Sequence, residues 1–218
     1  MKTTTIITIC VLALLSSTLQ AQLQIPEGFT EVRRSIETKI DFDGDGKKDT
    51  AIIIQGKGDC EWFYTSYFLI YLTSRNKTYA LKLACGIGHF TQLRVRNNTI
   101  RFGYVLHGTG VHAHEFTIRY NQREGRIQLI GFDFGHRIMG WHYSGYREVS
   151  YNLLTGDFHI TNTLPFFNNV EYYPEVRIDF FRGNRRMNPV FWEDIDFDLI
   201  YLLQSVGDEF EYRMEVEM

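Results

Sequence analysis

The sequence predicts an all-β protein whose mostly antiparallel strands form a meander, arranged as a sandwich or a partial propeller, with a short helix near the C-terminus. From Thr30 to about Ile160, short segments rich in Ile, Val, Tyr, Phe and Thr follow one another. Several of them, such as LRVR and FTIRY, alternate polar and apolar residues with the period of two that a half-buried strand requires. Turn sequences such as SRNK, NQREG and LTGD separate the segments and are typical of hairpins.

Each segment that fits this pattern is predicted to be a strand. Strands joined by such short turns are mostly antiparallel, and the absence of helical patterns between them excludes a parallel sheet with crossover helices. The predicted strands are residues 31–40, 50–55, 66–73, 77–84, 91–97, 99–107, 114–121, 126–134, 146–154 and 157–162.

The chain changes character after Pro165. Within EDIDFDLIYLLQSVGDEF, apolar residues recur at helical spacing, which predicts a short amphipathic helix, with a strand as the alternative. These residues are Ile195, Leu199, Leu202 and Leu203. Residues 22–218 are therefore expected to form one β-rich domain, with 165–218 as a C-terminal extension packed on it.

The first residues read as a secretory signal peptide covering residues 1–21. Lys2 precedes an apolar segment from Ile6 to Leu15, and small and polar residues follow up to Ala21. The apolar segment is about half as long as a membrane-spanning helix, so a membrane anchor is the less favoured alternative. The mature chain is expected to begin near Gln22, to contain no membrane span, and to act in the periplasm or outside the cell.

The charge and the cysteine content of the chain bear on its partners and on a possible disulfide. The formal net charge of −3 and the lack of a basic stripe argue against a nucleic-acid partner. Outside the signal peptide only Cys60 and Cys85 remain. In an exported protein this pair predicts a disulfide, which would stabilise the fold by about 3–4 kcal/mol, and two buried free thiols are the alternative.

The most specific motif is DFDGDGKKD, which lies just ahead of an apolar strand segment. Carboxylates at alternate positions of a tight loop can surround Ca²⁺, a cation that takes six to eight oxygen ligands, and glycine permits the sharp turn. The alternative is a solvated acidic turn. The predicted ligands are the side chains of Asp41, Asp43, Asp45 and Asp49 and the backbone carbonyl of Lys47.

This loop resembles the calcium loops of the FG-GAP and VCBS repeats of integrin-type propellers. That resemblance implies a structural ion that supports surfaces for binding proteins or carbohydrates. The loop departs from an EF-hand because Ile52 stands where that motif has glutamate, and it departs from a complete propeller because the chain has one copy. The order of the loop, FTIRYNQREGRIQLIGFDF and YREVSYNLLTGDFHI also resembles a family of exported bacterial β proteins without an assigned activity.

A second candidate metal site lies in HGTGVHAHE. On a strand, His112 and His114 point to the same face and can share one zinc ion. A third ligand would come from His107, His136 or His142, and histidines that bind no metal are the alternative.

Catalytic motifs are otherwise lacking in the sequence. We find no Gly-x-Ser-x-Gly, His-Glu-x-x-His or Ser-x-x-Lys motif, and we name no catalytic residue. Carboxylate pairs for glycoside hydrolysis could come from Asp133, Glu148 and Asp157, although hairpin positions also suit simple solvation.

The segment WHYSGY follows Gly140 and is expected to be a loop whose aromatic side chains bind a partner. The residues concerned are Trp141, His142, Tyr143 and Tyr146. Together these features predict an exported, calcium-stabilised binding protein that recognises a protein or a carbohydrate. The alternative is a metal-dependent hydrolase that uses a zinc site at His112 and His114.

Overall fold

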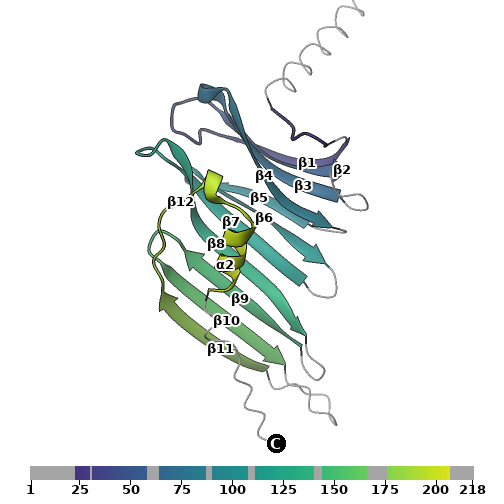
Figure 1. Ribbon diagram of the computed structural model, residues 1–218, viewed down its shortest axis with the longest axis vertical. Helices are drawn as coiled ribbons and strands as arrows, with labels where there is room; N and C mark the ends of the chain where they lie inside the picture. Colours follow the sequence, from purple (N-terminus) through teal and green to yellow (C-terminus); the bar gives the residue numbers. More distant parts are fainter. Residues whose placement is uncertain are drawn as a thin grey trace, which may run out of the picture. The chain divides into compact units, whose positions relative to one another are not determined.

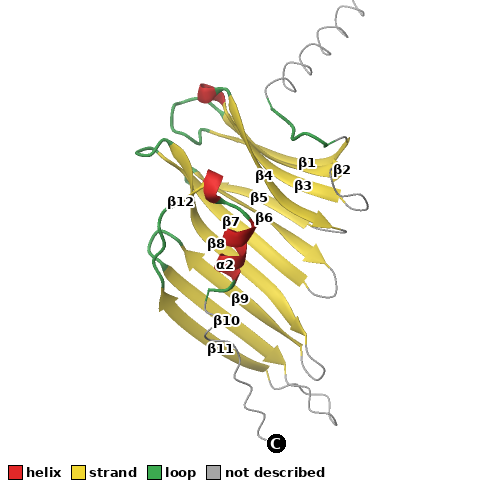
Figure 2. Ribbon diagram, viewed as in Figure 1, coloured by secondary structure: helices red, strands yellow, loops and turns green. Residues whose placement is uncertain are grey.

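The computed structural model describes residues 23–29, 31–57, 64–86, 90–107, 111–139, 144–165 and 176–206. The chain divides into two compact units, Met1–Cys85 and Gly86–Met218, which we call unit 1 and unit 2. Each unit is built on its own antiparallel sheet (Figures 1 and 2). The predicted all-β fold is therefore confirmed, and residues 22–218, predicted to form one domain, extend over part of unit 1 and all of unit 2. The predicted signal peptide lies outside the described residues.

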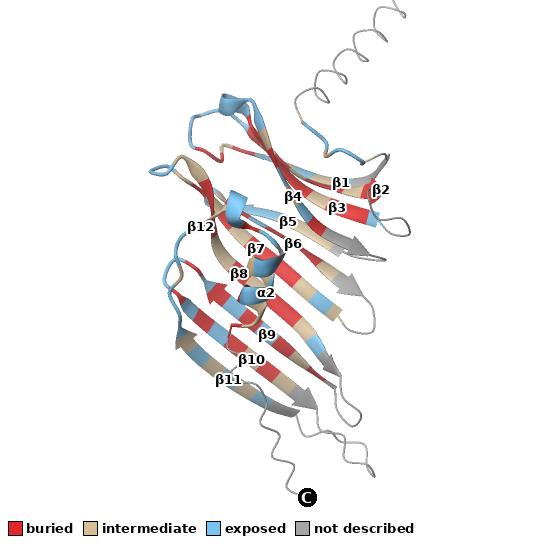
Figure 3. Cartoon of the chain, in the orientation of Figure 1, coloured by how far each residue is buried: buried red, intermediate tan, exposed pale blue. Residues whose placement is uncertain are grey.

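Unit 1 is a meander in the order β1-β2-β3-β4. The strands are β1 (Glu31–Ile40), β2 (Asp49–Lys57), β3 (Tyr64–Leu72) and β4 (Lys77–Gly86). The 3-10 helix η1 (Thr73–Arg75) joins β3 to β4. Side chains of β2 and β3 form the core, and Phe68, Leu69 and Ile70 are fully buried (Figure 3).

Unit 2 contains the larger sheet, in the order β11-β10-β9-β8-β7-β6-β5. Its strands are β5 (Phe90–Arg96), β6 (Thr99–His107), β7 (Val111–Asn121), β8 (Arg126–Met139), β9 (Ser144–Asn152), β10 (Asp157–Pro165) and β11 (Val176–Asn184). The short strand β12 (Val190–Phe191) pairs with β8 through Leu129 and Gln128. From β5 to β11, each strand pairs with the next strand in the sequence, which confirms the predicted meander.

One face of the unit 2 sheet is apolar and covered. Register places Phe102, Phe116, Phe132, Tyr151 and Phe158 in one row across β6 to β10, and all five are buried. The 3-10 helix η2 (Trp192–Asp194) and the helix α2 (Phe197–Gln204) lie on this face (Figure 1). Because side chains alternate along a strand, the residues between these positions point to the opposite face.

The helix predicted near the C-terminus is confirmed as α2. Its N-cap is Asp196, whose side chain accepts a hydrogen bond of 2.8 Å from the backbone N–H of Leu199, and Leu203 is fully buried. Strand β11 was not predicted from the sequence. Residues Val176 to Phe180 alternate apolar and polar, but β11 is an edge strand that leaves Ile178 49 % and Phe180 72 % exposed, so the alternation does not correspond to a buried face. No helix in the described ranges is long and apolar enough to span a bilayer.

Candidate functional site

The acidic loop of unit 1 connects β1 to β2. Asp41 directly follows β1, and Asp49 is the first residue of β2. Gly44 and Gly46 between them have φ values of 73° and 86°, a region that residues with a side chain rarely adopt. The two glycines therefore allow the loop to turn back on itself within a few residues.

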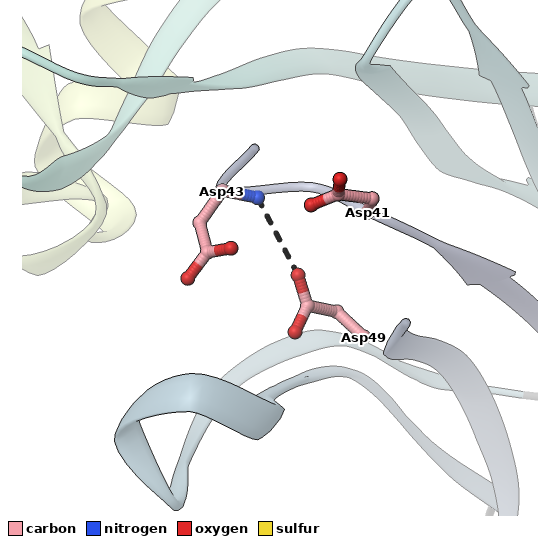
Figure 4. A group of neighbouring side chains, drawn as sticks. All are labelled: Asp41, Asp43 and Asp49. Atoms are coloured by element: carbon pink, nitrogen blue, oxygen red, sulfur yellow. Dashed lines mark hydrogen bonds between the residues drawn. The ribbon is translucent and has the colours of Figure 1, made fainter. Parts of the chain in front are cut away.

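Three of the predicted ligands come together in this loop. Asp41, Asp43 and Asp49 each offer a carboxylate oxygen, and these oxygens lie within 4.8 Å of one another (Figure 4). In the described part of the chain, no other group of three or more His, Cys, Asp or Glu residues lies so close together. Asp45 is exposed, and its carboxylate accepts a hydrogen bond of 2.8 Å from the backbone N–H of Lys47. Asp45 does not belong to this cluster of carboxylates.

Hydrogen bonds from the backbone orient the fully buried Asp49 carboxylate. Its Oδ2 accepts from the N–H groups of Phe42 at 3.0 Å and Asp43 at 3.4 Å, and its Oδ1 accepts from Thr73 N–H at 2.8 Å. The hydroxyl of Ser74 donates to Asp43 Oδ2 at 2.6 Å. These bonds tie the acidic loop to η1, a connection that sequence spacing does not reveal.

The electrostatics of the loop favour a bound cation. Burial raises the pKa of Asp49, and the neighbouring Asp43 raises it further against the lowering effect of the Thr73 and Phe42 hydrogen bonds. Two carboxylates about 5 Å apart repel by about 3 kcal/mol at an effective dielectric near 20. Asp41 Oδ1 is buried and has no hydrogen-bond partner. An all-oxygen donor set with an unsatisfied buried oxygen fits a hard divalent cation.

The predicted histidine pair lies on β7, with the two residues in different environments. His114 is buried between Tyr104 and Phe134, with ring centroids at 4.8 and 5.0 Å, and its Nε2 contacts the side-chain amide of Gln204 on α2. Burial, together with a smaller effect of the nearby His112, lowers the pKa of His114 to about 4. His114 is therefore a neutral imidazole in the packed face of the sheet.

His112 is exposed and lies opposite His136 on β8. Their rings are nearly parallel, with an interplanar angle of 9° and a centroid distance of 5.9 Å. Among the described side chains, no third ligand joins His112 and His114 in a compact group. The side chain of His107, the whole of His142, and Cys60 of the predicted disulfide lie outside the described residues.

A polar hollow of about 350 Å³ lies on the other face of the unit 2 sheet. Register pairs Glu115 with Asp133, and Ser150 with both Asp133 and His159, so these side chains share the face opposite the aromatic row. Charged and aromatic lining residues are Arg101, Glu115, Asp133, Tyr146, Glu148 and His159. The hollow is thus assembled from residues that are far apart in the sequence.

Glycine at position 135 makes room in this hollow. Gly135 lies opposite Glu148, and a Cβ atom there would lie 2.3 Å from the Tyr146 hydroxyl oxygen. With any side chain at residue 135, the end of the Tyr146 side chain would have to shift from this position. Burial raises the pKa of Tyr146, as does the charge of the nearby Glu148, so its hydroxyl keeps its proton near neutral pH.

The positively charged side chain in the hollow, Arg101, already forms ion pairs with neighbouring carboxylates. The Arg101 guanidinium forms ion pairs with both Glu115 and Asp133, the second at 2.8 Å. The side-chain amide of Gln92 also donates to Glu115. Glu148, in contrast, is exposed and has no ion pair in the described part of the chain. Three carboxylates and one guanidinium line the hollow, and these four groups together carry a net charge of −2.

These positions extend and correct what the sequence predicts. Tyr146 does not lie in a loop, because β9 begins at Ser144, and its half-buried side chain lines the hollow. Trp141, His142 and Tyr143 lie outside the described residues. Of the three candidate carboxylates, Asp133 and Glu148 line the hollow.

Asp157, the third candidate, does not line the hollow and accepts a hydrogen bond of 2.6 Å from Asn184. Hydrogen bonds with the side chains of Thr155 and Asn184 lower the pKa of Asp157. Glu115 and Arg101 were missed because only strand pairing brings them together.

Comparison with known proteins adds no assignment. No family model matches the chain, and neither the curated proteins nor the solved structures contain a significant match. The function must therefore be inferred from the acidic loop and the hollow.

Proposed function

We propose that the protein is an exported, calcium-stabilised binding protein that recognises its protein or carbohydrate partner through the hollow of unit 2. The observation that carries this proposal is the convergence of polar side chains from β5 to β10 on one concave site. A hollow with a few converging polar groups is the usual form of a ligand site. Its groups stand on paired strands, which hold them more rigidly than loops would.

The acidic loop supports the calcium part of the proposal. Asp41, Asp43 and Asp49 form the cluster that would hold the ion, and we retain Asp45 and the Lys47 carbonyl as further proposed ligands. A bound Ca²⁺ would supply two positive charges that cancel the repulsion among the carboxylates. The hydrogen bonds to Thr73 and Ser74 would then fix the β1–β2 loop to η1. This structural role agrees with the role of the ion in FG-GAP and VCBS loops.

The metal-dependent hydrolase is less well supported. His114 is neutral and buried, and among the described side chains no third ligand lies close to His112 and His114. The proposal therefore assigns recognition, and no bond-breaking step, to the hollow.

A cavity-filling variant tests the position of the site. Ser150 is an exposed residue of β9 that lines the hollow, and Ser150→Trp is expected to fill it. Leu154→Trp is the matched control, because Leu154 is 45 % exposed and lies in the β9–β10 turn.

The chain from Gln22 onward, labelled with ¹⁵N and kept in calcium, would be titrated with a panel of glycans, amines and short peptides. Ligands are expected to shift backbone resonances around the hollow, and binding should be lost in Ser150→Trp but not in Leu154→Trp. Ligands that bind Ser150→Trp as well as wild type would refute this site.

A further inference from the structure

The charge balance of the hollow indicates what kind of group it accepts. Arg101 is the one Lys or Arg among the described residues that line the hollow, and its guanidinium is already paired with the carboxylates of Glu115 and Asp133. The Glu148 carboxylate lies at an exposed position on the same face and forms no ion pair with a described residue. An anionic ligand would meet this net negative charge without an available cation, so the electrostatics disfavour anions.

The surroundings of Glu148 supply the other contacts that a cation needs. The ring of Tyr146 lies beside Glu148, and an aromatic ring attracts a nearby ammonium or guanidinium group. The hydroxyl oxygens of Ser150 and Thr161 line the same hollow and can accept hydrogen bonds from N–H donors. The volume of about 350 Å³ is at the small end of ligand sites, which suits the end of one side chain or a small amine.

We infer that the hollow binds its ligand through a cationic ammonium or guanidinium group held between the Glu148 carboxylate and the Tyr146 ring. This inference rests on the proposed function, because it names the ligand chemistry of the same site. The group can belong to a free amine or to a lysine or arginine side chain of a protein partner. Arg101 serves to hold Glu115 and Asp133 in place and leaves Glu148 as the contact for the ligand.

Two isosteric probes isolate the charge. N-acetyl-arginine methylamide carries a guanidinium, whereas N-acetyl-citrulline methylamide has nearly the same shape without the charge. Each would be titrated into the ¹⁵N-labelled chain in calcium, beside agmatine as the free amine, an arginine-containing peptide, and lactose. The arginine probe is expected to bind at least about tenfold more tightly than the citrulline probe, and more weakly when salt is raised to about 0.15 M.

Matched variants tie the effect to Glu148. Glu148→Gln is expected to weaken binding of the arginine probe about tenfold, as the loss of a charge-assisted contact does. Glu124→Gln removes the same charge from an exposed residue in the β7–β8 turn of the same unit and is expected to leave binding unchanged. Tyr146→Phe keeps the ring and is expected to keep binding. The dispersion of the amide spectrum shows that each variant is folded.

The outcomes separate this inference from the proposed function. Equal binding of both probes at the hollow, or binding of lactose there in preference to either, would overturn the cationic ligand and leave the binding site standing. If no probe shifts resonances at the hollow and the glycan and peptide panel also binds elsewhere, both proposals fail. Tight binding of the peptide with weak binding of agmatine assigns the cation to a protein partner, and the reverse assigns it to a free amine.

Discussion

Acidification is expected to destabilise unit 2 through His114, the one buried histidine among the side chains that the structure describes. Burial lowers the pKa of His114 to about 4 in the folded chain, while the unfolded chain keeps the ordinary value of 6.5. As the pH falls below 6.5, this histidine binds a proton in the unfolded state but stays neutral in the folded state. The stabilisation from a neutral His114 is therefore complete above pH 6.5 and is lost progressively down to pH 4. The lowered pKa corresponds to a loss of about 3 kcal/mol.

Chemical unfolding measured between pH 7 and pH 4 tests this prediction. Trp192 is buried in unit 2, so tryptophan fluorescence reports on the unfolding of that unit once Trp62, the tryptophan of unit 1, is replaced by Phe in every protein compared. In His114→Gln the group that titrates is gone, while a polar side chain remains opposite Gln204. The free energy of unfolding of this variant is expected to fall by about 3 kcal/mol less than that of wild type over the same pH range.

His159→Gln provides the control for this experiment. His159 is exposed on β10, and its replacement is expected to leave the pH dependence of wild type in place. If His114→Gln and wild type lose the same stability on acidification, His114 is not the group responsible and the reasoning from its burial is refuted.

The remaining predictions concern the acidic loop and the hollow. Calcium at about 100 times its dissociation constant is expected to stabilise wild type by about 2.7 kcal/mol, measured by thermal melting. The same calcium is expected to have little effect on the stability of Asp43→Asn. Glu37→Gln on β1 is the control and is expected to respond as wild type does. Equal responses of the two variants would contradict the site. Ser74→Ala removes the hydrogen bond to Asp43 and is expected to cost about 1 kcal/mol and to weaken calcium binding, as measured by titration calorimetry. Gly135→Ala is expected to lower the free energy of unfolding, measured in urea, by about 1–3 kcal/mol because its methyl group meets Tyr146. If Gly135→Ala lowers it equally in a Tyr146→Ala background, this contact is not the cause.

The parts of the fold that depend on neighbouring residues could be predicted from the sequence. Alternation along β6, β7 and β8 indicated these strands, and helical spacing around Leu199 and Leu203 indicated α2. The acidic cluster was also predictable, because its three carboxylates lie within nine residues. The alternation from Val176 to Phe180 also indicates a strand, but it does not give the burial of β11, because this edge strand leaves Ile178 and Phe180 exposed.

By itself, the sequence determined the strand-rich class, the meander and the acidic loop, because each follows from period-two patterning, turn residues or spacing within one short segment. Tertiary structure alone decided that Glu115 and Asp133 share Arg101, that Tyr146 lies over Gly135, and that Asp49 is bonded to Thr73. The physical reason is register. Alternation tells which residues of a strand share a face, but only the pairing of neighbouring strands determines which side chains meet across it.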